Sequence, residues 1–241
     1  MANWHWPGAD ASSWLSIRPA PRSKDLYSRI YGSAATRESL EILVRRGHVP
    51  LFVGNKPIED AGKEVQFANT IRQEIGLPPC QPKNVLFMYC TKTMAEAAKA
   101  EEYLVTANRD AVVHYGFADP SNYIGVKGYE AYAERAGTAT AVLAEAATTG
   151  NPEAGVKKKT PGYHASNLMI GTPDEVVKRI QAAQKAASFQ EITIVSQFGT
   201  MPYDEAEKST RLFAEECLPA IHKMDAPIHA SVLPTPIAKR A

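Results

Sequence analysis

Small residues precede a predicted helix at positions 32–36, and they are the first candidates for chemistry in this sequence. In order they are Gly32, Ser33, Ala34, Ala35 and Thr36. Small side chains let the backbone approach a ligand, and the N–H groups that begin a helix favour an anion such as phosphate. The hydroxyls of Ser33 and Thr36 could add hydrogen-bond donors. The alternative is a structural role in which Thr36 only caps the helix.

Residues that follow the last predicted strand form a second candidate site. Gln197 and Phe198 come directly after an apolar run at 191–196, and ligands of parallel α/β proteins bind at the carboxyl ends of the strands. Gln197 could donate a hydrogen bond to a planar ring while Phe198 packs against it. The alternative is a turn that buries Phe198 in the core. The pattern assigns no catalytic residue.

The turn at Gly171, Thr172 and Pro173 is another candidate phosphate turn, but helix capping already accounts for it. Thr172 suits the N-cap, Pro173 the first helical position and Glu175 the third, which together predict a capping box. The histidines offer no pair with the i, i+4 spacing of a zinc site, so we predict no metal. His164 either approaches the ligand end or lies at the surface or the edge of the core.

Short apolar runs alternate with helical patterns along most of the chain. We predict strands at 29–32, 49–54, 84–90 and 191–196. We predict helices at 36–46, 59–75, 93–115, 173–187 and 204–222, where apolar residues recur at helical spacing. Strands separated by helices favour right-handed βαβ units in a parallel sheet. This periodicity fits a doubly wound sheet as well as a barrel.

These elements indicate one domain at residues 25–222. Glycine and proline interrupt the rhythm in an excursion at 118–167, which contains an alanine-rich helical piece near 129–147 and is too short to hold its own core. We predict an irregular arm at 1–24 and a flexible tail at 223–241, which contains several prolines.

Composition excludes several partners. The chain has 27 Lys and Arg against 26 Asp and Glu, a net charge of +1, which gives no electrostatic footprint for nucleic acid or an anionic membrane. No apolar run is long enough to suggest a membrane span, and the first residues do not resemble a signal peptide. Three widely spaced cysteines, Cys80, Cys90 and Cys217, are expected to be packed thiols. We therefore expect a cytoplasmic protein.

Two runs near the end of the chain resemble luciferase-like flavin monooxygenases. The first extends from Asn167 to Ile180, and the second from Ile192 to Pro202. Residues 16–23 and 31–39 are similar to the family's approach to its fifth barrel strand and to the flavin-phosphate turn that follows. A departure is the segment 186–189, where the family usually has a turn that contains glycine. The resemblance covers nearly all of residues 15–222.

The resemblance implies a TIM barrel that uses reduced FMN and dioxygen to oxygenate a small organic substrate. It implies that residues 32–36 hold the phosphate of FMN while the cofactor carries the oxygen chemistry. The family normally begins with four further strands, so this chain corresponds to a partial barrel of about four strands. A partial barrel leaves two open sheet edges, which implies either truncation or association with a second copy or another chain.

Three alternatives stay open. The deazaflavin F420 could replace FMN, because the two cofactors share the layout of ring and phosphate. The chain could be a catalytically incomplete remnant that binds flavin or stabilises a partner subunit. It could also bind a phosphate ligand other than a flavin on the same scaffold. A monooxygenase would further need an electron donor, such as a separate flavin reductase.

Overall fold

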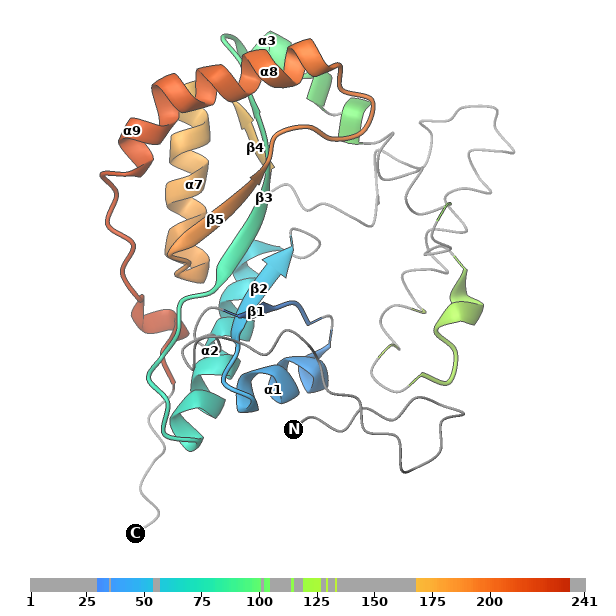
Figure 1. Ribbon diagram of the computed structural model, residues 1–241, viewed down its shortest axis with the longest axis vertical. Helices are drawn as coiled ribbons and strands as arrows, with labels where there is room; N and C mark the ends of the chain where they lie inside the picture. Colours follow the sequence, from blue (N-terminus) through green and yellow to red (C-terminus); the bar gives the residue numbers. More distant parts are fainter. Residues whose placement is uncertain are drawn as a thin grey trace, which may run out of the picture.

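A computed structural model of the chain describes residues 30–34, 36–53, 57–100, 102–104, 114, 119–126, 129, 133 and 168–234 (Figure 1). Its strands are β1 (Tyr31–Gly32), β2 (Val49–Val53), β3 (Lys83–Cys90), β4 (Leu168–Gly171) and β5 (Glu191–Val195). Its α-helices are α1 (Arg37–Arg45), α2 (Ile58–Glu74), α3 (Met94–Ala97), α7 (Pro173–Ala187), α8 (Tyr203–Leu212) and α9 (Leu218–Ile221). A π-helical turn (Phe213–Cys217) joins α8 to α9, and 3₁₀ turns cover Pro120–Asn122 and Ala230–Val232.

Every strand pair in the described sheet is parallel. The first residues of β3 are paired with both β2 and β5, so these two strands lie on opposite edges of β3. The short strand β4 lies beside the last residues of β3. Strands β1, β2, β3 and β5 follow one another across the sheet in this order, and β4 lies on the same edge of β3 as β2, because Phe87 is paired with both Leu168 and Val195. This is the α/β arrangement of a partial TIM barrel, and it confirms the predicted fold class.

The two faces of β3 bury different clusters. Leu86 and Met88 point into the larger cluster, where they meet Val176 and Ile180 of α7. Phe87 points to the opposite face, into a smaller cluster completed by residues near the carboxyl ends of the strands. Because both faces of β3 are covered, its sequence is a continuous apolar run and does not alternate between apolar and polar residues.

The structure differs from the predicted elements at three places. The strand β4 was not predicted, because its four residues follow the excursion directly. The helix predicted at 93–115 begins as α3, and among the described residues it continues only at 99–100, 102–104 and 114. The helix predicted at 204–222 is interrupted by the π-helical turn. Pro219 explains the interruption, since it has no N–H to donate and its ring displaces the carbonyl one turn earlier.

Residues 223–234, which the sequence predicts to belong to a flexible tail, contact the body of the domain. Val232 is fully buried, and its carbonyl accepts a hydrogen bond of 2.9 Å from Asn69 Nδ2 on α2. Gln81 Nε2 donates to the carbonyl of Ala226 at 2.7 Å. Side-chain amides from the body of the domain thus hold this segment in place.

Several predictions lie outside the described residues. They are the arm at 1–24, most of the excursion and its alanine-rich helical piece, Ala35 and His164. Where the chain is described, the structure contains no helix that is both long enough and apolar enough to cross a membrane.

Candidate functional site

The predicted phosphate turn joins β1 to α1. Ser33 is exposed, while Ala34 packs against the small cluster beneath α1. Thr36 has extended backbone and its Oγ1 accepts a hydrogen bond of 3.2 Å from the N–H of Ser39. The same hydroxyl lies 3.2 Å from Ser39 Oγ, to which it donates. This is the geometry of the N-cap alternative, so the Thr36 hydroxyl already has partners within the helix.

Glycine at position 32 has a structural cause. A Cβ atom there would lie 2.1 Å from Leu43 Cδ1, because α1 packs directly over the end of β1. The close approach therefore brings the first turn of α1 to the end of the strand. It does so whether or not a ligand binds.

The first turn of α1 offers backbone donors to a ligand. The cap occupies the N–H of Ser39, and the N–H of Leu40 bonds to the carbonyl of Thr36 at 3.0 Å. Among the hydrogen bonds between described residues, none uses the N–H of Arg37 or Glu38. Such groups at a helix start attract anions. The carboxylate of Glu38, in the same turn, opposes that attraction.

Arg37 is a residue that the sequence reasoning missed. Its guanidinium lies 4.4 Å from the centre of the Phe67 ring, so a cation–π contact holds the positive charge against α2. The signal was present, because Arg37 directly follows the predicted turn in sequence. Its contact with Phe67, 30 positions away on α2, could not be read from spacing.

The structure separates the turn from Gln197. Gly32 is paired with Pro50 of β2, and the next residue of β2, Leu51, is paired with Lys83 of β3. Gly32 is therefore level with the residue that precedes Lys83. Gln197 follows Val195, which is paired with Phe87. Val195 is therefore five residues, or about 17 Å, further along the strands than Gly32, and Gln197 lies two residues beyond Val195. A cofactor held by both parts of the predicted site would have to extend over that distance.

The structure supports the buried-Phe alternative for the turn after β5. Phe198 is buried and packs edge-on against Phe87, with ring centres 5.7 Å apart and planes at 77°. Gln197 is exposed, and its Nε2 donates to the carbonyl of Met201 at 3.3 Å. Gln197 therefore closes its own turn, and its side chain must leave this bond to reach a ligand.

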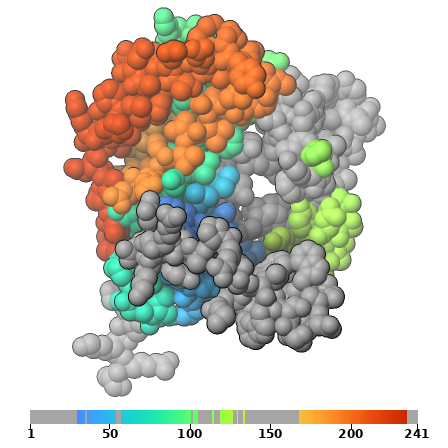
Figure 2. Space-filling model, in the orientation of Figure 1, coloured from blue at the N-terminus to red at the C-terminus, as the bar shows by residue number. Residues whose placement is uncertain are grey.

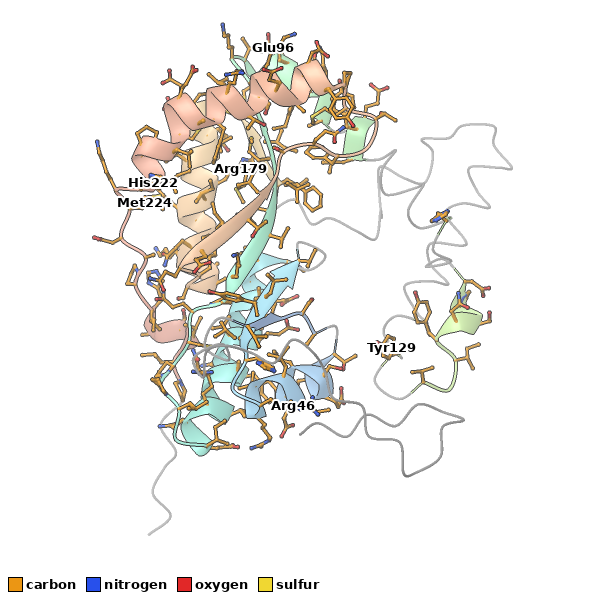
Figure 3. The ribbon with its side chains drawn as sticks, viewed as in Figure 1. Arg46, Glu96, Tyr129, Arg179, His222 and Met224 are labelled. Atoms are coloured by element: carbon orange, nitrogen blue, oxygen red, sulfur yellow. The ribbon has the colours of Figure 1, made fainter. Side chains whose placement is uncertain are left out.

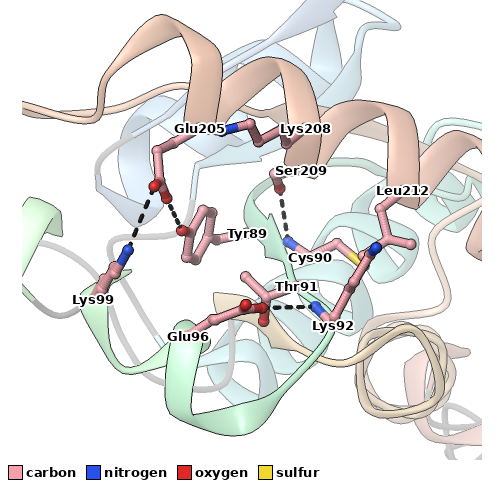
Figure 4. Close-up of a pocket in the computed structure, with 10 residues that line it drawn as sticks. All are labelled: Tyr89, Cys90, Thr91, Lys92, Glu96, Lys99, Glu205, Lys208, Ser209 and Leu212. Atoms are coloured by element: carbon pink, nitrogen blue, oxygen red, sulfur yellow. Dashed lines mark hydrogen bonds and ion pairs between the residues drawn. The ribbon is translucent and has the colours of Figure 1, made fainter.

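A pocket of about 360 Å³ lies at the carboxyl end of β3, between α3 and α8 (Figure 4). In the space-filling view the orange-red residues of the last helices cover this end of the molecule (Figure 2). The pocket is lined by Tyr89, Cys90, Thr91, Lys92, Glu96, Lys99, Glu205, Lys208, Ser209 and Leu212. Its size is typical of small-molecule sites, and its position is the ligand end of a parallel α/β protein.

Tyr89 and Glu205 form the polar centre of this pocket. The Tyr89 hydroxyl donates to Glu205 at 2.5 Å, and Lys99 Nζ lies 3.4 Å from the same carboxylate. Burial, and then the bond to Glu205, raise the pKa of Tyr89. The bond from Tyr89 is the main cause that lowers the pKa of Glu205. At neutral pH the phenol therefore keeps its proton and the carboxylate stays ionised.

Replacing Tyr89 with phenylalanine should make stability less sensitive to acid. The pKa of Glu205 is lower in the folded protein than the ordinary value of 4.5. Its contribution to the free energy of unfolding is therefore fully present above about pH 4.5 and is lost as pH falls through the lowered pKa. Without the Tyr89 hydroxyl the pKa of Glu205 moves back toward 4.5. Urea unfolding from neutral pH to about pH 3 should show the two proteins converging in free energy of unfolding as pH falls.

Tyr203→Phe is the control, because Tyr203 lies on α8, the helix that carries Glu205, and is 81% exposed. Other carboxyls with lowered pKa are common to both proteins and cancel in the difference; they are Asp119, Glu191 and Asp204. A difference between wild type and Tyr89→Phe that stays constant with pH would show that Tyr89 does not control the titration of Glu205.

The predicted capping box at α7 is wrong. Thr172 occupies the N-cap and Pro173 the first position, but the Thr172 side chain makes no capping hydrogen bond. Glu175 instead forms an ion pair of 2.9 Å with Arg179, which also donates to the carbonyl of Leu168 at 3.3 Å (Figure 3). Arg179, one turn further along α7, competes for Glu175 and anchors α7 to β4.

Two threonine caps give a matched prediction. Thr36→Ala should lower the free energy of unfolding by about 1 kcal/mol, because it removes the bond to the N–H of Ser39. Thr172→Ala should change it by less than about 0.5 kcal/mol, since no bond is lost. Urea denaturation measures both. Equal losses in the two variants would contradict the assigned caps.

Comparison with known proteins gives matches among solved structures. No protein-family model matches the chain, and no curated protein does. Riboflavin lyase RcaE, solved with modified FMN and riboflavin, has a TM-score of 0.53 at 17% identity over 83% of this chain and 45% of the lyase chain. The long-chain alkane monooxygenase LadA has a TM-score of 0.51 at 16% identity over 84% of this chain and 44% of its own.

Monooxygenase RslO1 from Streptomyces bottropensis is 24% identical over 85% of this chain and 50% of its own, with a TM-score of 0.45. The chain spans about half the length of the solved proteins that it matches. The likeness to RcaE and LadA establishes the fold.

Proposed function

We propose that this chain forms part of a flavin-dependent monooxygenase of the luciferase-like group, which oxygenates a small organic substrate. The observation that carries the proposal is the first turn of α1. Among the described residues no hydrogen bond uses the N–H groups of Arg37 and Glu38 there, and Arg37 adds a positive side chain that contacts the Phe67 ring. The fold shared with RcaE, a protein solved with modified FMN, and with the monooxygenase LadA supports it.

In this proposal the turn holds the phosphate of FMN. The donors are the amides that begin α1 and the hydroxyl of Ser33, with Gly32, Ala34 and Ala35 leaving room and Arg37 adding charge. Thr36 contributes through the cap that fixes the turn, and Gln197 is the candidate contact to the ring. Reduced FMN, when bound, would supply the reaction with dioxygen. The protein's own part is to bind, orient and exclude water.

A partner completes the barrel in this proposal. Within the described sheet, β1 is paired only with β2, and β5 only with β3, so each presents one open edge. Open edges pair readily with further strands. A second copy or another chain that supplies such strands would close the barrel, and a flavin reductase would deliver the reduced cofactor.

Two measurements test this function. FMN should raise the Tm of the purified protein, and added flavin reductase with NADH should then drive oxygen uptake that depends on substrate. A rise in Tm without oxygen uptake would favour the incomplete remnant, and a rise with F420 alone would favour deazaflavin use. If inorganic phosphate stabilises the protein as well as FMN does, the site binds phosphate ligands in general. If none of these compounds changes the Tm, the proposed function is wrong.

A further inference from the structure

The three cysteines are buried with free thiols, as the sequence predicts, but two of them are neighbours in space. The sulfurs of Cys90 and Cys217 lie 3.9 Å apart, although the residues are 127 positions apart in the chain. Cys90 is the last residue of β3, and Cys217 is the last residue of the π-helical turn. Among the described residues Cys80 has no such sulfur contact.

One member of this pair lines a pocket, although only 1% of its surface is exposed. Cys90 contributes to the wall of the pocket of about 360 Å³, next to Ser209 and Leu212 of α8 (Figure 4). Cys217 does not line the pocket, and its Sγ lies 3.6 Å from the carbonyl of Pro173. The pair is therefore asymmetric, because Cys90 contributes to the pocket wall and Cys217 does not.

The backbone around Cys217 allows the sulfurs to approach. A disulfide requires a sulfur–sulfur distance of about 2.05 Å, so the two atoms must move together by roughly 1.9 Å. Cys217 ends a π-helical turn, a helix type in which the hydrogen-bond ladder is already rearranged. Closing the gap requires rotation of the two side chains, with an adjustment of this turn.

We propose that Cys90 and Cys217 form a peroxide-responsive disulfide that fastens the helix of residues 203–221 to the end of β3. The oxidant is a hydroperoxide, here hydrogen peroxide. The Cys90 sulfur attacks one peroxide oxygen, an S–O bond forms, the O–O bond breaks, and water leaves after protonation. The Cys217 sulfur then attacks the sulfenic sulfur, the S–O bond breaks and a second water leaves. Two thiols and one peroxide give one disulfide and two waters.

The local chemistry makes this reaction slow and pH-dependent. Burial, and then the neighbouring Cys217, raise the pKa of Cys90 to about 12. Because the thiolate is the nucleophile, the reacting fraction grows about tenfold for each pH unit below that value. The reduced pair is therefore stable at neutral pH, and sustained exposure to peroxide is needed to close it.

The bond would restrain the wall of the pocket. The N–H of Cys90 already donates to Ser209 Oγ on α8 at 2.8 Å, so β3 and this helix are in contact before oxidation. A disulfide that closes so long a loop should raise the Tm by about 5–10 °C, and dithiothreitol should reverse the rise. None of this depends on whether the protein binds a flavin.

Peptide mapping of the full chain tests the disulfide. The folded protein is treated with hydrogen peroxide, unfolded in iodoacetamide and digested without reductant. A peptide that joins Cys90 to Cys217 should appear, while Cys80 should be alkylated. The Cys80→Ser variant should form the same cross-link, and Cys217→Ser should leave a sulfenic acid at Cys90 that dimedone traps. The rate should rise about tenfold between pH 7 and pH 8.

Two results would overturn the disulfide. One is that iodoacetamide still alkylates both Cys90 and Cys217 after the folded protein has been treated with peroxide. The other is that Cys80 oxidises as fast as Cys90, which would show that the pocket and the paired sulfur give no selectivity. Mapping of the wild-type chain decides both, so neither depends on a variant that might not fold.

Discussion

Replacing Gly62 with valine should lower the free energy of unfolding by about 3 kcal/mol or more. Gly62 lies within α2, where this helix crosses α7. A Cβ at this position would lie 2.3 Å from the carbonyl oxygen of Ala186 and 3.4 Å from its carbon. Because the obstacle is backbone, no side-chain rotation relieves the contact. The two helices must separate, which opens the larger core cluster that includes Ala61 and Ala183.

The control for this change is Gln73→Val, which places the same β-branched residue on the exposed face of the same helix. The control should cost about 0.5 kcal/mol, from helix propensity alone. Thermal unfolding would record Gly62→Val as a loss of about 10 °C in Tm. Equal losses in the two variants would show that α2 and α7 do not approach as closely as the structure indicates.

Replacing Ser33 with glutamate should weaken FMN binding about 100-fold, because a carboxylate then faces the phosphate across a few ångströms. Ser33 is exposed at the start of the turn, so the change should leave the core intact. An acid near the start of α1 interacts favourably with the helix dipole, so stability should stay within about 0.5 kcal/mol of wild type. Ala35 is equally part of the predicted turn but lies outside the described residues.

Ser33→Gln is the matched control, with a side chain of similar size and no charge. It should weaken FMN binding less than about tenfold. Isothermal titration gives both affinities, and urea unfolding shows whether either variant has lost stability. If the two variants lose the same affinity, steric bulk rather than charge is responsible. If Ser33→Glu binds FMN as wild type does, the turn does not hold the phosphate.

Local patterns predicted the sheet well. The apolar run at 84–90 and the alternation of strands with helices were sufficient for β3 and for the parallel order, because both depend on short-range periodicity. β4 was missed because four residues that run into a helix start do not stand out from their surroundings. The Thr172 cap failed for another reason: sequence spacing shows that a bond can form, but not which partner Glu175 takes.

Long-range contacts could not be predicted. Tyr89 and Glu205 are 116 positions apart, and no pattern along the chain indicates that they meet. The contact of Gly62 with α7 could not be predicted either. From the sequence alone, a glycine at this position indicates only a residue of low helix propensity. The proline-rich tail was predicted flexible because the amides that hold it, such as Asn69, lie in distant elements.

The most direct test of the central claim compares FMN with riboflavin, which lacks the phosphate, in titrations of the same protein. If the start of α1 holds the phosphate, FMN should bind about 100-fold more tightly, and added salt should reduce the difference. Equal affinities for the two compounds would contradict the account, since the phosphate would then contribute nothing to binding.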